Sequence, residues 1–318
     1  QSIETQDLAQ MSTNSVRSLT ANQAKNLTTD QVAALTTAQI TAVETAKFAE
    51  LTTAQIVALT TQQMAGLTTA QLANMTSAQV AALETRDLVN LSTTQLQALT
   101  TAQMSQLTTF QIANLTTSQV ATLETNDVAV LTNLQVAAFT SVQLPVMTTD
   151  QLKALTSAQV GALTSAQLPK FDTAQLVGID ANDLKALSTA AINSLTSTQA
   201  PGLTTAQIVA LTTAQAAALT TNEVSKLTTT QVAAIETEDL VKMTTAQIVA
   251  LTTDHASALT TSQINNLTTA QIAAIETRDL VKLTTDQIVA LSSAQIPAFT
   301  TDQLVNLTTA QMRAIETL

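Results

Sequence analysis

A period of eight residues runs through the chain without a slip. Stepping by eight from Ile3 meets a large apolar residue every time, and residues 3–314 hold 39 complete octads. We number the places of an octad 1 to 8 from that apolar residue. Repetition of this kind predicts a fold made by stacking one small unit many times. We therefore expect a single continuous domain, 1–318, although 318 residues could otherwise form two.

Each place has its own chemistry, as in the typical octad Leu-Thr-Thr-Ala-Gln-Ile-Val-Ala of Leu51 to Ala58. Places 1 and 6 are apolar and hold all seven Met, while place 2 is always Thr, Ser, Asp or Glu. Place 5 is Gln in 28 of 39 octads. Because places 1 and 6 are apolar throughout, we expect them to form the core. Place 4 is expected to face solvent.

Places 2 to 5 form a capping-box pattern, in which a Thr hydroxyl accepts from the N3 amide and Gln reaches back to the cap amide. The charges support this interpretation. Of 23 acidic residues only Glu50 falls outside places 2, 4 and 5, and nine of 12 basic residues fall at places 7 or 8. Early acids and late bases suit a helix dipole. Each octad is therefore predicted to form one short helix that opens near place 2 and ends near place 7 or 8.

The helix-breaking residues agree with that boundary. All four Pro stand at place 7, and all four Gly stand at places 7 or 8, namely Gly66, Gly161, Gly178 and Gly202. Pro costs about 3 kcal/mol inside a helix, so the helix must be near its end there. Gly and Asn at place 8 predict a left-handed residue after each helix.

These observations favour an all-α solenoid of short helices, one per octad. A single long helix is excluded, because eight residues leave the place-1 residues rotated by roughly 80° per octad, so they form no stripe. The alternative is a β-solenoid, since Thr, Ile and Val favour strands. One octad cannot fold alone, so neighbouring octads must stack.

A longer period of 40 residues is superimposed on the octads. Glu occupies place 2 at Glu4, Glu44, Glu84 and Glu124, and again at Glu236, Glu276 and Glu316, usually with Asp at place 5. Forty residues are five octads, and the register jumps between the two groups. The period reflects either duplication or one superhelical turn. In these octads we expect the side chains at places 2 and 5 to face one another.

The chain offers no residues for catalysis, a cofactor or a metal site, so we expect it not to be an enzyme. His255, the only histidine, stands at place 5 and is expected to replace Gln as a cap. The Glu/Asp octads could ligate Ca²⁺ only if a 40-residue turn stacked them. With a net charge of −11 and five aromatic residues, nucleic-acid binding is not expected, and no apolar run suits membrane insertion.

Leu-Thr-Thr-Ala-Gln repeated in register resembles the octapeptide repeat tracts of large secreted or cell-surface bacterial proteins. The resemblance implies an extracellular or cell-surface location and a structural role in a filament, stalk or matrix fibre. Neither end of the sequence carries a polar capping repeat, so we expect either that the sequence is a window on a longer array or that the chain binds itself, head to tail or laterally. The alternative is an adhesive module that binds a protein, a glycan or a surface such as ice through its repeated exposed residues.

Overall fold

The computed structural model describes residues 4–316, so Ile3 lies outside the described part. The chain divides into two compact units, Gln1–Leu155 and Thr156–Leu318. The octad phase of the sequence continues from one unit into the next.

Each complete octad forms one short helical element, and residues 4–316 contain no strand. The all-α, solenoid-like prediction is therefore confirmed, and the β-solenoid alternative is wrong. The longest helix has seven residues, and no helix in the described part of the chain is long and apolar enough to cross a membrane.

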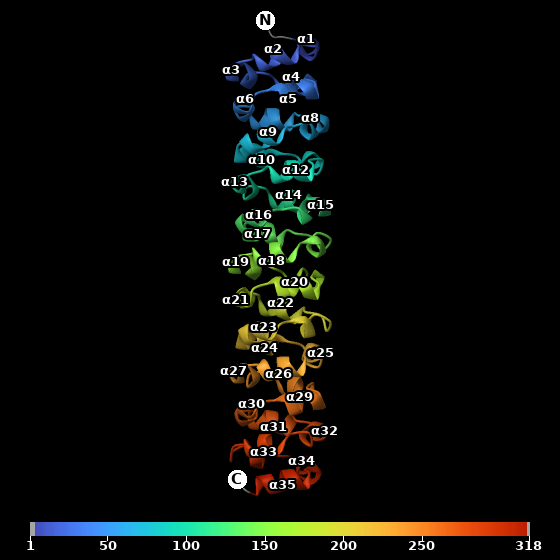
Figure 1. The fold of residues 1–318 in the computed structure, drawn as a ribbon, viewed down its shortest axis with the longest axis vertical. Helices are drawn as coiled ribbons and strands as arrows, with labels where there is room; N and C mark the ends of the chain where they lie inside the picture. The colour runs from blue at the N-terminus through green and yellow to red at the C-terminus, as the bar shows by residue number, and fades with distance from the viewer. Residues whose placement is uncertain (1–3, 317–318) are drawn as a thin grey trace. The chain divides into compact units, whose positions relative to one another are not determined.

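The helices of the first unit follow one another along Figure 1. They are α1 (Thr5–Gln10), α2 (Thr13–Arg17), α3 (Ala21–Lys25), α4 (Thr29–Ala34), α5 (Thr37–Ala42), α6 (Thr45–Ala49), α7 (Thr53–Val57), α8 (Thr61–Ala65), α9 (Thr69–Asn74), α10 (Ser77–Ala82), α11 (Thr85–Leu88), α12 (Thr93–Gln97), α13 (Thr101–Met104), α14 (Thr109–Asn114), α15 (Thr117–Ala121), α16 (Thr125–Val130), α17 (Asn133–Ala137), the 3₁₀ helix η1 (Leu144–Val146) and α18 (Thr149–Lys153).

The second unit continues the same pattern. Its helices are α19 (Ser157–Gly161), η2 (Leu168–Lys170), α20 (Thr173–Gly178), α21 (Ala181–Leu184), α22 (Thr189–Asn193), η3 (Ala200–Gly202), α23 (Thr205–Ala210), α24 (Thr213–Ala218), α25 (Thr221–Val224), α26 (Thr229–Ala234), α27 (Thr237–Leu240), α28 (Thr245–Val249), α29 (Thr253–Ala258), α30 (Thr261–Asn266), α31 (Thr269–Ala274), α32 (Thr277–Leu280), α33 (Thr285–Val289), η4 (Ile296–Ala298), α34 (Thr301–Asn306) and α35 (Thr309–Ile315).

The capping box explains where each helix begins. In α13, Thr100 is the N-cap, with an extended backbone at φ −75° and ψ 158°. Its hydroxyl accepts from the Gln103 amide at 3.3 Å, and Gln103 Oε1 accepts from the Thr100 amide at 2.6 Å. This satisfies helix amides that would otherwise lack partners. Place 2 is the cap and place 3 the first helical residue, as the sequence predicts.

The four proline octads keep the cap bond at place 2 but form a 3₁₀ helix in place of an α-helix. Each Pro lies in one of the 3₁₀ elements η1 to η4. Proline has no amide hydrogen to continue the α-helical ladder. In η1 the cap bond from the Thr140 amide to Gln143 Oε1 persists at 2.8 Å. The prediction that the helix ends near place 7 is confirmed.

The predicted left-handed residue after each helix is wrong. No described residue has a positive φ, and Gly66 at place 8 has φ −85° and ψ −7°. Close packing against another turn explains glycine at this place, as at Gly66 beside Thr37 in the first unit. A Cβ on Gly202 would lie 2.6 Å from Thr173 Cγ2, on the preceding turn. Glycine at this place therefore permits close approach of two turns.

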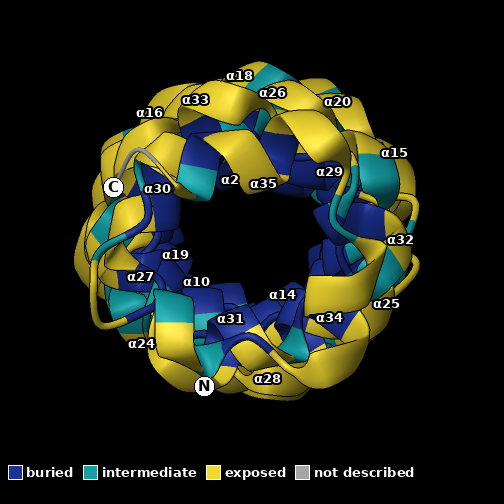
Figure 2. Cartoon of the chain, turned by 90° about the horizontal axis from the view of Figure 1, so that it is seen from below, coloured by how far each residue is buried: buried dark blue, intermediate teal, exposed yellow. Residues whose placement is uncertain are grey.

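Within each unit, an element packs against the third element along the chain, as in α2 with α5 and α24 with α27. Places 1 and 6 face inward, so Leu72 and Met75 are 0% and 4% exposed. In Figure 2 buried residues line the inside of the winding and exposed residues its outside. The predicted core is confirmed, and place 4 is exposed as expected, with Phe110 67% exposed.

Candidate functional site

Within each unit, a row of buried place-5 side chains joins successive turns. Gln103, 2% exposed, directs Nε2 to two carbonyl oxygens of the preceding turn, 2.9 Å from Leu72 O and 2.6 Å from Met75 O. These partners are 31 and 28 residues earlier in the chain. The same pair of separations recurs from Gln39 in the first unit and from Gln311 in the second. We call each such set of bonds a place-5 joint.

The joint uses the full hydrogen-bonding capacity of a primary amide. Oε1 accepts from the cap of its own helix, and the two Nε2 hydrogens reach two carbonyls of the preceding turn. A buried carboxylate can accept the first bond but cannot donate the others. A net contribution of about 1 kcal/mol per hydrogen bond makes the row a major source of cohesion.

The joint also fixes the superhelical period. A separation of 28 residues is three and a half octads, and the bonds span 28 and 31 residues rather than 40. The interpretation of 40 residues as one superhelical turn is therefore wrong, and duplication is left to explain that period. The stacked Ca²⁺ site depended on a 40-residue turn and loses its geometric basis. In residues 4–316 no group of three or more His, Asp or Glu could hold a metal ion.

Two unusual place-5 residues keep part of the joint. His255, 4% exposed, accepts the Thr252 amide on Nδ1 at 3.2 Å, and its Nε2 lies 2.7 Å from Leu227 O, 28 residues earlier. These partners fit the tautomer with hydrogen on Nε2. Lys47 donates to Arg17 O at 2.7 Å and pairs with Glu44 at 3.1 Å. The prediction that His255 replaces Gln as a cap is confirmed.

The Glu/Asp octads lack the joint. The Glu N-caps make no side-chain cap bond, as at Glu124 and Glu236. Burial, followed by the charge of the place-2 Glu, raises the pKa of Asp127 and of Asp239 from 3.8 to about 6. The place-2 and place-5 carboxylates therefore lie close enough to repel, as the sequence suggests. Burial also raises the pKa of Glu223, which stands at place 5 of a Thr-capped helix.

Two of these octads neutralise their acids with an arginine at place 4. Arg86 Nε lies 2.7 Å from Glu84 Oε2 and 3.6 Å from Asp87 Oδ2 in α11. In α32, Arg278 lies 2.5 Å from Glu276 Oε2 and 3.7 Å from Asp279 Oδ1. One guanidinium thus lies within ion-pair distance of both acids in each octad, although its approach to the aspartate is too long for a hydrogen bond and Asp279 Oδ1 has no hydrogen-bond partner.

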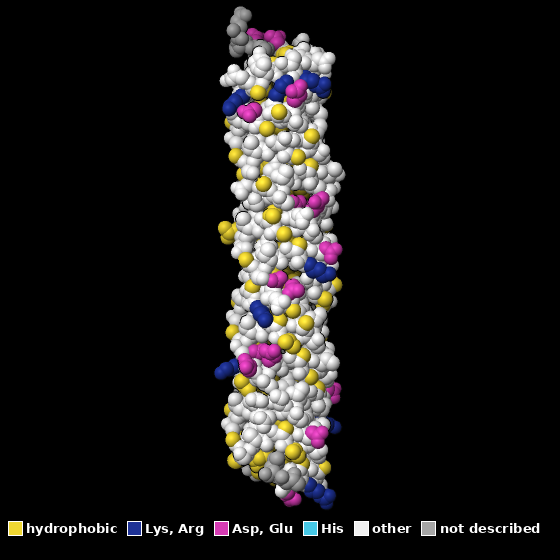
Figure 3. Space-filling model, turned by 60° about the vertical axis from the view of Figure 1, so that its left-hand side comes forward, with side chains coloured by type: hydrophobic (Ala, Val, Ile, Leu, Met, Phe, Trp, Pro, Cys, Tyr) yellow, Lys and Arg dark blue, Asp and Glu magenta, His cyan; other side chains and the backbone are white. Residues whose placement is uncertain are grey.

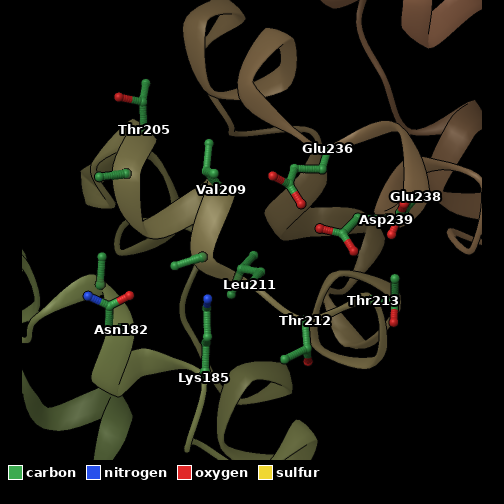
Figure 4. Close-up of a pocket in the computed structure, with 13 residues that line it drawn as sticks. Asn182, Lys185, Thr205, Val209, Leu211, Thr212, Thr213, Glu236, Glu238 and Asp239 are labelled. Carbon is green, nitrogen blue, oxygen red and sulfur yellow. The ribbon is translucent and has the colours of Figure 1, made fainter.

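The corresponding octad at α27 has Glu238 at place 4 instead of arginine. Asp239 is 3% exposed, and its Oδ2 has no hydrogen-bond partner. Beside it opens a surface hollow of about 780 Å³, entirely within the second unit. Glu236 and Asp239 extend into this hollow in Figure 4, and Lys185 extends into it from α21. We call it the α27 hollow.

The rest of the surface carries few charges. On the face drawn in Figure 3 charged groups are scattered among uncharged polar and apolar side chains. The first unit has large apolar residues at place 4, with Phe110, Leu134 and Val142 exposed by 67%, 73% and 66%. Phe110 and Leu134 come from α14 and α17, which contact each other. We call Phe110 and Leu134, whose helices contact each other, the place-4 patch.

The ALTTAQ repeat profile matches the chain at residues 1–37, 40–77, 80–117, 120–157, 147–173, 176–213, 201–229, 232–269 and 272–309. The chain belongs to the ALTTAQ repeat family. Matches that begin at 40, 80 and 120, and at 232 and 272, are spaced by the same 40 residues as the Glu octads. A comparison with curated proteins found no match.

The cap bonds of the place-5 joint could be predicted from the sequence, whereas its bonds to the preceding turn could not. The cap bonds follow from spacing within one octad, whereas the bonds from Nε2 cross to residues 28 and 31 positions away. One signal was present in the composition of place 5. A capping box accepts Glu or Gln, yet place 5 holds 28 Gln and only one Glu, Glu223. That bias indicates that the NH₂ group itself has a partner.

Proposed function

We propose that this ALTTAQ repeat chain is a structural protein that forms or belongs to an extracellular filament, stalk or matrix fibre. The observation that carries the proposal is the place-5 joint, which is repeated along both units with the same partners. A joint between two turns uses only local groups of those turns. Turns can therefore be added without changing the design, as in other solenoids.

Self-association is the proposed mode of assembly, head to tail or laterally. Place-6 residues are buried from Leu8 to Ile288, but Leu304 in α34 and Met312 in α35 are 43% and 41% exposed. In the proposed assembly, a turn of a second copy covers them. A contact between unlike surfaces of this kind propagates into an open filament unless it closes. The proposed location is extracellular or at the cell surface, as for the repeat tracts that the sequence resembles.

Electron microscopy with sedimentation velocity tests the proposal. We expect the purified chain to form filaments whose length grows with protein concentration. A double variant, Leu304→Glu with Met312→Glu, places charges on the exposed apolar residues and should shorten or abolish them. The matched control Val305→Glu changes an exposed place-7 residue and should assemble normally. Monodisperse single chains at every concentration would reject the proposal.

An adhesive module is the second candidate, favoured by the place-4 patch. Solvent-facing apolar residues that lie together on a soluble surface commonly mark a contact site. Adsorption of the unassembled double variant to an apolar surface can be followed by quartz-crystal microbalance. If the patch adheres, Phe110→Ser should lower the adsorbed mass severalfold. An unchanged adsorbed mass would reject this candidate.

A further inference from the structure

We propose that the α27 hollow binds a guanidinium group supplied from outside the chain, at the carboxylates of Glu236 and Asp239. The site would accept a small guanidinium compound or the arginine side chain of a partner. This inference concerns the second unit alone and does not depend on filament assembly.

The chain itself shows what fits this pair of acids. In α11 and α32, a place-4 arginine lies between the place-2 Glu and the place-5 Asp, with its closest approaches at 2.7 Å and 2.5 Å. A planar guanidinium can serve two carboxylates because its donors form a fixed fork. In α27 the same two acids remain, but the arginine is replaced by Glu238.

The acids of α27 pair with no cation among the described residues, although Lys185 lines the same hollow. No ion pair within 4.0 Å is formed by Glu236, Glu238 or Asp239 in that part of the chain. Asp239 Oδ2 is buried without a hydrogen-bond partner, and Figure 4 shows its carboxyl directed into the hollow. An unpaired buried carboxylate is costly, so a donor entering the hollow would relieve that cost.

The shape of the hollow suits a guanidinium on an aliphatic stem. Val209 and Leu211 form an apolar wall next to the acids, while the open side leads to solvent. A metal ion fits less well, because no group of three or more His, Asp or Glu in residues 4–316 could hold one. Arginine stems commonly lie along apolar surface while the head group binds carboxylates.

The surrounding charges set the pH dependence of binding. The hollow is faced by Glu236, Glu238 and, from α21, Lys185. Helices α24 and α30, which pack against α27, carry no charged residue. Burial and the neighbouring glutamates raise the pKa of Asp239 to about 6, so the Asp239 carboxyl that would bind the guanidinium is ionised above that pH. Binding should therefore weaken as the pH falls through about 6.

Isothermal titration of the full chain with propylguanidinium at pH 8 tests the proposal. We expect saturable binding at one site, about tenfold or more tighter than propylammonium, which lacks the fork. The variant Glu238→Arg supplies the missing internal guanidinium and should weaken binding tenfold or more. It should still fold, since α11 and α32 carry arginine at this place, and circular dichroism checks this.

The matched control Glu238→Gln removes the same charge without supplying a guanidinium, and should retain affinity within about threefold. A second variant, Asp239→Gln, removes this carboxyl and should abolish binding in a folded chain. The absence of saturable binding, or equal losses in Glu238→Arg and Glu238→Gln, would overturn the proposal. Titration with an acetyl-Gly-Arg-Gly-amide peptide distinguishes the sources: tighter binding than propylguanidinium indicates a partner's arginine, and equal or weaker binding indicates a small ligand.

Discussion

Helices α27 and α28 are consecutive octads of one unit, yet they join the preceding turn in different ways. In α28, Gln247 Oε1 accepts from the Thr244 amide at 2.6 Å, and its Nε2 reaches Leu219 O at 2.6 Å. In α27, Asp239 occupies the same place and has no hydrogen to donate when ionised. The comparison shows that place 5 decides whether an octad donates to carbonyl oxygens of the preceding turn or presents a buried carboxylate, which in α11 accepts from the Thr61 hydroxyl instead.

Gln103→Glu is expected to cause the largest loss of stability, because it converts an intact joint into the acidic type. A carboxylate would face two carbonyl oxygens that now accept Nε2 at 2.9 Å and 2.6 Å. The expected loss is about 3 kcal/mol or more at pH 8, seen in urea unfolding and in amide exchange around Leu72. The control Gln62→Glu changes an exposed place-4 residue and should cost less than about 0.5 kcal/mol. Equal losses would contradict the joint.

Asp239→Gln replaces an acid at place 5 by glutamine, the opposite of Gln103→Glu, and should stabilise the second unit. The new amide can donate toward the carbonyls 28 and 31 residues earlier, those of Leu211 and Ile208, as Gln does at other joints. We expect a gain of about 1–3 kcal/mol at pH 8, measured by urea unfolding. The gain should shrink below pH 6, where Asp239 becomes protonated. A loss of stability at pH 8 would show that the acid has a partner in the folded chain.

The acidic octads should also make stability depend on pH in an unusual direction. The pKa values of Asp127 and Asp239 rise from 3.8 to about 6, so the folded state holds these protons more tightly than the unfolded state. Their contribution is fully present below pH 3.8 and is lost as the pH rises through about 6. Each should contribute on the order of 1 kcal/mol, since nearby water screens part of the effect.

Urea unfolding between pH 5 and pH 8 measures this contribution. The chain should become more stable as the pH falls from 7 to 5, and the double variant Asp127→Gln with Asp239→Gln should show a much flatter profile. The pKa of Asp279 shifts in the same direction, so a residual slope is expected. A chain that is most stable at pH 8 and loses stability steadily on acidification would contradict the assignment.

The smallest expected effect on stability is the difference between removing a Thr N-cap and removing a Glu N-cap. Thr244 accepts the Gln247 amide in α28, whereas Glu236 makes no side-chain cap bond in α27. Thr244→Ala should therefore cost about 1 kcal/mol, and Glu236→Ala should lose no capping energy. Thermal unfolding of both variants at pH 8 checks the difference. A larger loss for Glu236→Ala would mean that Glu236 does cap its helix.

The part of the fold that could be predicted from sequence is the part that one octad determines. The Thr–Gln box, the buried places 1 and 6 and the exposed place 4 follow from contacts within eight residues. The place-5 joint could not be derived that way, because Gln103 meets Leu72 and Met75 only after the chain has completed a turn. The predicted left-handed residue after each helix was wrong for the same reason. Glycine at Gly202 leaves room for Thr173 of another turn, a contact that one octad does not reveal.

The candidate site at α27 was only partly visible in the sequence. The recurrence of Glu with Asp at places 2 and 5 was found, and the two side chains do interact. The importance of Glu238 emerges only beside Arg86 and Arg278, whose ion pairs show what a cation does at place 4. The hollow itself depends on residues of α21 and α23, which begin 56 and 32 residues before α27 and which the octad pattern does not bring together with it.

Nuclear magnetic resonance of the Gln103 side-chain amide tests the central claim most directly. The account predicts slow exchange of its NH₂ hydrogens with solvent and through-space contacts to Leu72 and Met75, 31 and 28 residues earlier. Rapid exchange, or contacts to residues near 40 positions away, would contradict the place-5 joint and the superhelical period derived from it.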